Sequence, residues 1–78
     1  MRVKVEMQRL APDMETGVIV RWIKQVGDSV AAGEPIVEVE TNKVTVDMPA
    51  MDTGVLAEIV RGPDADVPVG DVIAWLES

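Results

Sequence analysis

Side chains that could carry covalent or metal chemistry are scarce in this sequence, because its 78 residues include no cysteine and no histidine. The usual thiol nucleophile, the usual general base and the commonest metal ligands are therefore absent, and we predict neither a catalytic residue nor a metal site. Lys43 is the candidate that remains, because the pattern around it places it in a turn. A lysine in a turn is in most proteins a solvated surface charge. An exposed amine in a fixed position can also be acylated, so Lys43 is a candidate attachment site for a carried group.

The residues on both sides of Lys43 predict a β-hairpin with Asn42 and Lys43 as its two-residue loop. The facing pairs in this register are Val39 with Val46, Val37 with Met48, Glu40 with Thr45 and Glu38 with Asp47. All apolar side chains then lie on one face and all charged ones on the other. Because side chains alternate between the faces of a strand, a slip by one residue would set valines against Thr45 and Asp47, so the pattern defines the register. Lys43 lies in neither strand, and we expect Glu40 to lie near its ammonium group.

The composition and the turn residues predict an all-β fold. Hydrophobic residues make up 47% of the chain and aromatic residues only 3%, with six Gly and five Pro. Valine-rich runs bounded by turn residues are typical of strands. The predicted strands are 2–8, 18–24, 36–41, 44–48, 55–60 and 72–77. No segment of eleven or more residues has a helical period, so the strands favour a sandwich or a barrel.

The charge of the chain argues against nucleic acid as a partner. Seven Lys and Arg stand against 14 Asp and Glu, which gives a net charge of −7, and no basic cluster is present. Nucleic-acid binding depends mainly on cations that neutralise phosphates, so we do not expect it. No apolar run approaches a membrane-spanning length and no signal peptide is visible, so we expect no membrane partner. The absence of cysteine fits a reducing compartment, and we expect the cytoplasm, or the mitochondrial matrix in a eukaryote.

An internal repeat relates residues 12–41 to residues 49–78 with an offset of 37 and no gap. The identical positions are Pro12 and Pro49, Met14 and Met51, Thr16 and Thr53, Gly17 and Gly54, Val18 and Val55, Val30 and Val67, Gly33 and Gly70, Ile36 and Ile73, and Glu40 and Glu77. Turn glycines and apolar residues recur, so we predict one domain, residues 1–78, in which two equivalent β units pack about a pseudo-twofold axis. The hairpin of Lys43 joins the two units and should therefore lie at the end of the domain opposite both termini.

Several spaced motifs resemble the lipoyl domain of 2-oxo acid dehydrogenase complexes, within the biotinyl and lipoyl domain family. They are Val18-Ile19-Val20-Arg21-Trp22, Gly27-Asp28-Ser29-Val30, Gly33-Glu34-Pro35-Ile36, Glu38-Val39-Glu40-Thr41-Asn42-Lys43-Val44-Thr45-Val46 and Thr53-Gly54-Val55-Leu56. The resemblance covers nearly the whole chain. It implies a flattened β-barrel, or barrel-sandwich hybrid, of two four-stranded antiparallel sheets with pseudo-twofold symmetry, so two short strands should add to the six above. The motif around Lys43 most resembles domains of 2-oxoglutarate dehydrogenase succinyltransferases.

The resemblance also implies a cofactor and partners. Lipoic acid would be joined to Lys43 as an amide by a lipoate ligase or an octanoyl transferase. In the family this group is reductively acylated by a thiamine-diphosphate-dependent 2-oxo acid decarboxylase. It then passes the acyl group to coenzyme A in the acyltransferase catalytic domain and is reoxidised by a flavin-dependent dihydrolipoamide dehydrogenase. The domain would be a monomeric, non-catalytic carrier within a dihydrolipoyl acyltransferase.

The resemblance points to four residues that would guide recognition. Glu40 and Gly27, three and sixteen residues before the lysine, match family positions associated with correct modification. Asn42 and Val44 flank the lysine as further candidates. The family usually has aspartate in place of Asn42. Asparagine keeps the size and tolerates turn geometry, so we expect modification to persist and recognition by the decarboxylase to be affected.

Two other functions are compatible with a hairpin lysine. A biotin carrier shares the fold, but its lysine is typically flanked by methionines rather than by residues such as Asn42 and Val44. An unmodified barrel-sandwich module used only for assembly usually lacks the exposed lysine and has helical insertions at the hairpin, which this sequence does not contain.

Overall fold

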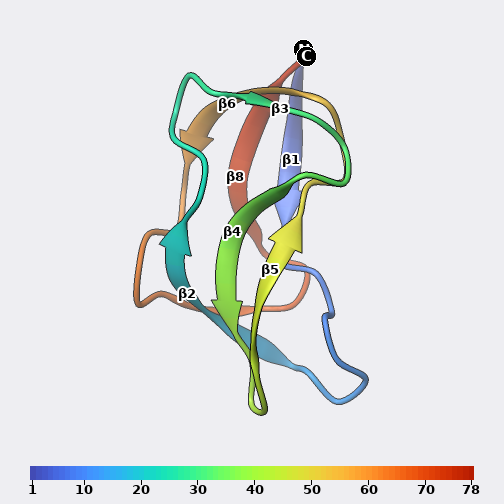
Figure 1. Ribbon diagram of the computed structural model, residues 1–78, viewed down its shortest axis with the longest axis vertical. Helices are drawn as coiled ribbons and strands as arrows, with labels where there is room; N and C mark the ends of the chain where they lie inside the picture. The colour runs from blue at the N-terminus through green and yellow to red at the C-terminus, as the bar shows by residue number, and fades with distance from the viewer.

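Eight β-strands make up the computed structural model, which describes all 78 residues (Figure 1). The strands are β1 (Arg2–Glu6), β2 (Thr16–Trp22), β3 (Ser29–Val30), β4 (Pro35–Glu40), β5 (Thr45–Pro49), β6 (Gly54–Ile59), β7 (Asp66–Pro68) and β8 (Val72–Glu77). They form two four-stranded sheets with the strand orders β1-β8-β6-β3 and β5-β4-β2-β7, and all pairs are antiparallel. The predicted flattened fold of two four-stranded antiparallel sheets is confirmed. No helix of the length and apolarity needed to cross a bilayer is present.

The structure contains the two short strands that the family resemblance implied beyond the six predicted from alternation. β3 has two residues and β7 has three, so neither is long enough to show a period of two. They are defined by their partners, because β3 pairs with β6 and β7 pairs with β2. The strand predicted at 18–24 spans Thr16–Trp22 instead. It ends there because the N–H groups of Ile23 and Lys24 both donate to the carbonyl of Ile36, at 2.8 and 3.2 Å, which interrupts the regular pairing.

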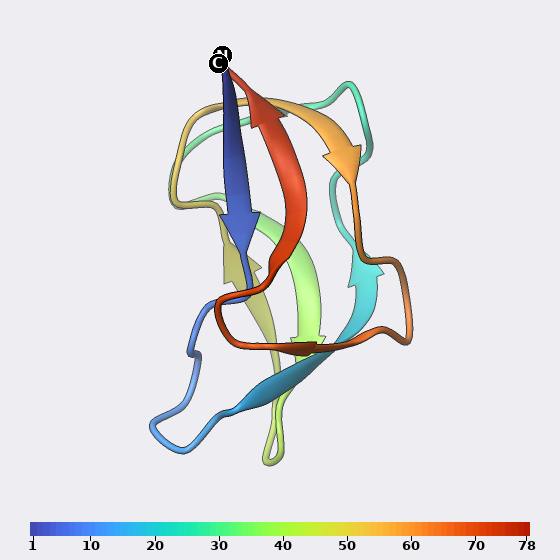
Figure 2. The same ribbon diagram turned by 180° about the vertical axis from the view of Figure 1, so that it is seen from behind.

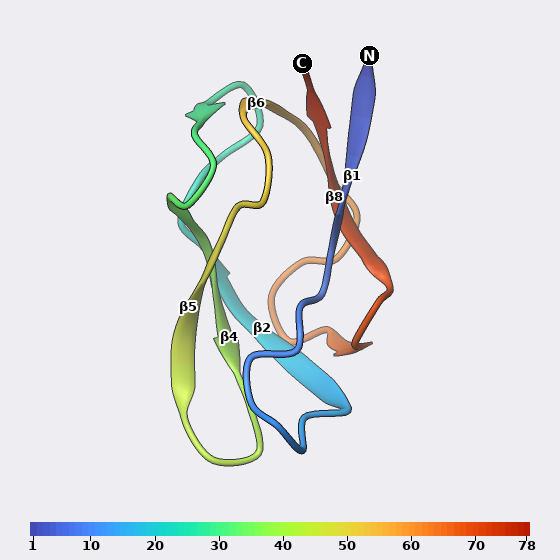
Figure 3. The ribbon, with the colours of Figure 1, turned by 90° about the vertical axis from the view of Figure 1, so that its right-hand side faces the viewer.

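The core lies between the two sheets, where their inward-facing side chains meet. It consists of fifteen buried hydrophobic residues, which are Val5, Met7, Met14, Ile19, Val30, Ile36, Val37, Val39, Met48, Ala50, Leu56, Val67, Ile73, Ala74 and Leu76. Most occupy inward positions of strands, as a period of two requires. Met7 and Met14 come instead from the loop between β1 and β2, residues 7–15. They hold this loop at the end of the domain that carries the hairpin of Lys43 (Figure 3).

The two halves of the chain exchange equivalent hydrogen bonds that are 37 residues apart. The N–H of Gly27 donates to the carbonyl of Leu56 at 2.8 Å, and the N–H of Asp64 donates to the carbonyl of Ile19 at 2.7 Å. Gly27 has a φ of 99° and Asp64 a φ of 72°. Aspartate is one of the few residues besides glycine that adopt this left-handed backbone readily. Each half therefore completes the hydrogen bonding of the other through a turn of the same conformation.

The two termini lie together at one end of the molecule, and the hairpin of Lys43 lies at the opposite end (Figure 1 and Figure 2). The N–H of Ser78 donates to the carbonyl of Met1 at 2.9 Å. The terminal ammonium group of Met1 lies 3.1 Å from a carboxylate oxygen of Glu77. This is the arrangement predicted from the place of the hairpin between the two repeated units.

At two turns, the backbone conformation alone should determine how far an alanine substitution lowers the free energy of unfolding. Gly33 and Gly70 have φ angles of 88° and 97°, and a Cβ atom at either would meet nothing within 4 Å. We expect Gly33→Ala and Gly70→Ala each to lower the free energy of unfolding by about 1 kcal/mol, because the left-handed region is strained for alanine. Gly62→Ala is the matched control, since its surroundings are equally open and its φ is not positive. It should leave stability unchanged or raise it slightly in urea denaturation, and equal losses at all three sites would contradict the prediction.

Candidate functional site

The β4–β5 hairpin has the register predicted from the sequence. The paired residues are Val39 with Val46, Val37 with Met48, Glu40 with Thr45 and Glu38 with Asp47. Val37, Val39 and Met48 are fully buried in the core, while the charged residues of these pairs face outward. Burial of one face thus determines which residues are left for the turn, and Asn42 and Lys43 occupy it.

The turn at Asn42 and Lys43 is held by the side chain of Thr41. Two-residue hairpin loops usually form primed turns, which need a positive φ at one or both loop residues. Neither Asn42 nor Lys43 has a positive φ. The Thr41 hydroxyl instead accepts hydrogen bonds from the N–H groups of Lys43 (3.2 Å) and Val44 (3.1 Å), and it donates to the Val44 carbonyl at 2.8 Å. The tolerance of asparagine for a left-handed backbone is therefore not used here.

The Lys43 side chain projects into solvent and pairs with an acid from another loop. It is 66% exposed, and its Nζ lies 3.5 Å from Oδ2 of Asp13, whose side chain is 54% exposed. The amide of Asn42 donates to the same oxygen at 3.4 Å. Glu40 is exposed at the end of β4, but the ion-pair partner of Lys43 is Asp13 rather than Glu40.

The loop of residues 7–15 places Asp13 beside the hairpin. It is anchored by the buried side chains of Met7 and Met14, and the guanidinium of Arg9 donates to the Met14 carbonyl at 2.6 Å. Figure 3 shows the loop and the hairpin at the same end of the molecule. The sequence does not predict this role for Asp13, because neither the strand period nor the repeat relates the loop to the hairpin. The contact forms only when both segments pack on the same core.

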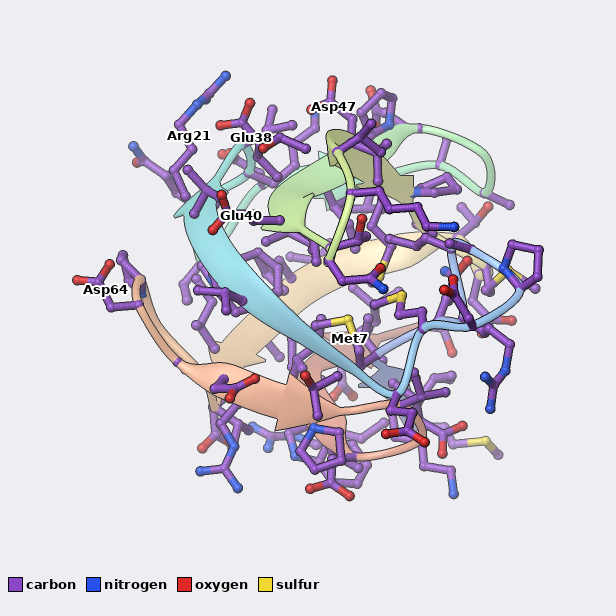
Figure 4. The ribbon with its side chains drawn as sticks, turned by 90° about the horizontal axis from the view of Figure 1, so that it is seen from below. Met7, Arg21, Glu38, Glu40, Asp47 and Asp64 are labelled. Carbon is purple, nitrogen blue, oxygen red and sulfur yellow. The ribbon has the colours of Figure 1, made fainter.

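The outer face of the sheet beside the hairpin is acidic. Glu38, Glu40 and Asp47 lie on this face together with Arg21 (Figure 4). The Nε of Arg21 is 3.1 Å from Oε1 of Glu38. Lys43 therefore lies at the edge of a negatively charged surface, and such a surface attracts partners with basic surfaces.

The residues predicted for recognition do not all lie at the tip of the hairpin. Asn42 and Val44 flank Lys43, and Val44 is 56% exposed although it is apolar. Gly27 lies in the connection between β2 and β3, which runs through the upper half of Figure 1, whereas the tip is at the lower end. Gly27 therefore lies away from the tip that carries Lys43. The roles of Gly27, Glu40, Asn42 and Val44 in recognition stay predictions.

A family model matches nearly the whole chain. The family described as biotin-requiring enzyme, Biotin_lipoyl, matches residues 3–76. The chain belongs to the Biotin_lipoyl family. The matched residues include the β4–β5 hairpin that carries Lys43.

Two curated relatives of this Biotin_lipoyl domain are acetyltransferase components of pyruvate dehydrogenase complexes. Component 2 of the mitochondrial dihydrolipoyllysine-residue acetyltransferase of Arabidopsis thaliana is 49% identical over 72 residues. The corresponding component of Rickettsia conorii is 44% identical over 77 residues. The alignments cover 91% and 97% of this chain, but only 13% and 19% of the two relatives.

Two solved structures share the fold of the Biotin_lipoyl domain. The solution structure of the lipoyl domain of the 2-oxoglutarate dehydrogenase complex from Azotobacter vinelandii has a TM-score of 0.70 at 29% identity, and the match covers 95% of this chain and 96% of that one. The crystal structure of the Kluyveromyces lactis urea carboxylase has a TM-score of 0.72 at 23% identity and covers 96% of this chain and 7% of that one. The second likeness shows the fold alone. The resemblance to lipoyl domains that the sequence motifs indicated is confirmed.

The site fits the covalent attachment of a long acyl group. The Lys43 amine is accessible, and its one ion-pair partner is the exposed carboxylate of Asp13. Amide formation removes the positive charge of Lys43 and with it this ion pair, at little cost because both groups are solvated. The chain has no thiol or imidazole. Redox or acyl-transfer chemistry would therefore come from the attached group.

The ion pair between Asp13 and Lys43 should contribute little to stability, because exposed pairs contribute about 0–1 kcal/mol. We expect a double-mutant cycle with Asp13→Asn and Lys43→Gln, measured by urea denaturation, to give a coupling free energy below about 1 kcal/mol. The coupling should fall as salt is raised to about 1 M, since salt screens exposed charges. Asp52→Asn is the control, because Asp52 is exposed and forms no ion pair, and it should not couple to Lys43→Gln. A coupling above about 2 kcal/mol that persists in salt would contradict the exposed geometry.

Proposed function

We propose that this chain is the lipoyl carrier domain of a 2-oxo acid dehydrogenase complex and that lipoic acid is attached to Lys43. The observation that carries the proposal is the exposed amine at the tip of a hairpin whose backbone is held in one conformation. Alignment over nearly the whole chain with the two acetyltransferase components supports it. A solved lipoyl domain of the same fold supports it as well.

The choice of Lys43 over the other two lysines rests on their surroundings. The Lys4 side chain is 57% exposed, but Lys4 lies within the paired strand β1 and not in a turn. The Lys24 side chain is only 25% exposed, and its Nζ is 3.2 Å from Oε2 of Glu34. Hydrogen bonds from the Ala31 backbone and from Lys24 lower the pKa of Glu34, because they favour the ionised carboxylate that pairs with Lys24. Lys43 is thus the lysine best placed to meet a modifying enzyme.

The domain acts in this proposal as a carrier and a substrate, not as a catalyst. A lipoyl group bound at Lys43 would supply a dithiolane that can be reduced and acylated, chemistry that the chain's own side chains lack. The domain holds the backbone of Lys43 in the turn and presents this residue at the end of the molecule opposite both termini. The longest dimension of the molecule is 33 Å, so a tether at either terminus would not obstruct the tip.

The proposed partners are those of an acyltransferase component. They are a lipoate ligase or an octanoyl transferase for modification, a thiamine-dependent 2-oxo acid decarboxylase, an acyltransferase catalytic domain and a dihydrolipoamide dehydrogenase. The relative at 49% identity belongs to a pyruvate dehydrogenase complex, and the solved lipoyl domain at 29% belongs to a 2-oxoglutarate dehydrogenase complex. The higher identity favours the pyruvate type over the succinyltransferase type that the sequence motif indicated. We propose the cytoplasm or the mitochondrial matrix as the location of the domain. The Arabidopsis thaliana relative is named as mitochondrial.

Modification of Lys43 is tested directly by mass spectrometry. The domain is co-expressed with a lipoate ligase and, in parallel, with a biotin ligase, and its intact mass and peptide map are determined. We expect a lipoyl-sized increment on the peptide that contains Lys43. Lys43→Arg should remove the increment, while the matched variants Lys4→Arg and Lys24→Arg should keep it. A biotin increment would favour the biotin carrier. No increment with either ligase would favour the unmodified assembly module. Either outcome would contradict the proposal.

The position of the lysine within the turn should matter as much as its presence. Asn42→Lys combined with Lys43→Asn keeps the composition and charge and moves the amine by one residue. Because adjacent side chains of a turn project in different directions, we expect the initial rate of lipoylation by the ligase to fall at least about tenfold. Urea denaturation of the swapped variant checks that the fold is intact. An unchanged rate would mean that the ligase reads only an exposed lysine and not its place in the hairpin.

A further inference from the structure

Thr41 is the buried polar side chain of this structure, with 8% of its surface exposed. It lies two residues before Lys43, between the last paired residue of β4 and the turn. Its hydroxyl accepts hydrogen bonds from the N–H groups of Lys43 and Val44, at 3.2 and 3.1 Å, and donates to the Val44 carbonyl at 2.8 Å. A hydroxyl has one donor and two acceptor sites. All of them are therefore used on the residues of this turn.

The Thr41 hydroxyl accepts the hydrogen bond from Val44 that a backbone carbonyl accepts in an ordinary antiparallel pair. The N–H of Thr41 donates to the Val44 carbonyl at 2.8 Å, as in an ordinary antiparallel pair. The N–H of Val44 donates to the Thr41 hydroxyl, and the N–H of Lys43 donates there too. Threonine side chains that bond to nearby backbone groups stabilise turns in this way. The turn thereby closes without the positive φ angles that a primed turn would demand of Asn42 and Lys43.

The repeat supplies a comparison within the molecule. The counterpart of Thr41, 37 residues further on, is Ser78. The N–H of Ser78 and its hydroxyl both donate to the carbonyl of Met1, at 2.9 and 3.3 Å. The hydrogen bonds that Thr41 donates to the Val44 carbonyl thus recur between Ser78 and Met1, at the end of the domain that holds both termini. The two hydrogen bonds that the Thr41 hydroxyl accepts from N–H groups occur only at the end that carries the hairpin. Those two bonds are the ones that act on Lys43 and Val44.

We propose that Thr41 is a positioning residue for the modification of Lys43. Its hydroxyl holds the backbone of Lys43 and Val44, so that the lysine side chain leaves the tip from one place and in one direction. A modifying enzyme then meets a preorganised amine and does not have to order the turn itself. The inference rests on the proposed lipoyl function and deepens it by naming how the site is presented.

Loss of the hydroxyl should loosen the tip without unfolding the domain. Thr41→Val keeps the size and the branched Cβ and removes all three side-chain hydrogen bonds. The freed N–H groups lie at a hairpin tip, where water can replace the hydroxyl and local opening is separate from global unfolding. Only part of the population then has the turn conformation that the ligase binds. The apparent affinity falls in proportion, while the chemical step is unaffected.

The test compares four forms of the domain: wild type, Thr41→Val, Thr41→Ser and Thr45→Val. Thr45→Val is the matched control, because Thr45 also lies two residues from Lys43, is exposed and makes no side-chain hydrogen bond. Initial rates of lipoylation by a lipoate ligase are measured against domain concentration, well below the melting temperature of every form. Amide hydrogen exchange at Lys43 and Val44, measured by NMR on the unmodified domain, reports the order of the tip.

For Thr41→Val we expect a KM for the domain that is higher by roughly tenfold with a kcat close to wild type, and faster exchange at Lys43 and Val44. Thr41→Ser should restore both values, and Thr45→Val should match wild type in both. A wild-type domain that is modified, together with a Thr41→Val variant that has the same KM as Thr45→Val, would overturn the inference and leave the proposed function standing. A wild-type domain that is not modified would overturn the proposed function, and the inference with it.

Discussion

Burial of one face of the β4–β5 hairpin is the constraint on which the position of Lys43 depends. Val37, Val39 and Met48 are fully buried, and a side-chain period of two leaves no neighbouring register that buries them together. Thr41, the residue that follows β4, is the last buried residue before the turn, so the turn begins at Asn42. The lysine is placed by the hydrophobic packing of residues that take no part in its chemistry.

Close packing of β2 against β4 and the loop of residues 7–15 builds the surroundings of the lysine. A Cβ atom on Gly17 would lie 2.7 Å from Cγ1 of Val39 and 2.8 Å from Cε of Met14. Glycine at this position therefore lets the strand and the loop share one part of the core. The loop is held there by Met14, and this places Asp13 against the hairpin. The ion pair at the tip thus depends on a contact between Asp13 and Lys43, which lie in segments far apart in the chain.

The pseudo-twofold arrangement gives the fold two similar ends with different roles. At one end Thr41 and Val44 are joined by the turn that carries Lys43, and at the other Ser78 and Met1 form an equivalent hydrogen bond across the open ends of the chain. The two halves need one another, because their turns exchange backbone hydrogen bonds. A carrier built in this way has its attachment point and its possible tethers at opposite ends. Amidation of the lysine would change the net charge from −7 to −8 and leave the acidic outer face of the sheet more negative.

The sequence by itself determined the all-β class, the hairpin register and the place of Lys43 in the turn, because alternation and turn chemistry are properties of consecutive residues. It could not determine the short strands β3 and β7, which have too few residues to show a period and exist only through their partners. It pointed to Glu40 as the acid near Lys43, and only the tertiary structure showed Asp13 in ion-pair contact. Nor did it indicate that the Thr41 hydroxyl closes the turn. Burial and hydrogen bonding between distant segments arise when the two sheets pack, so they are decided by the three-dimensional arrangement and not by any local pattern.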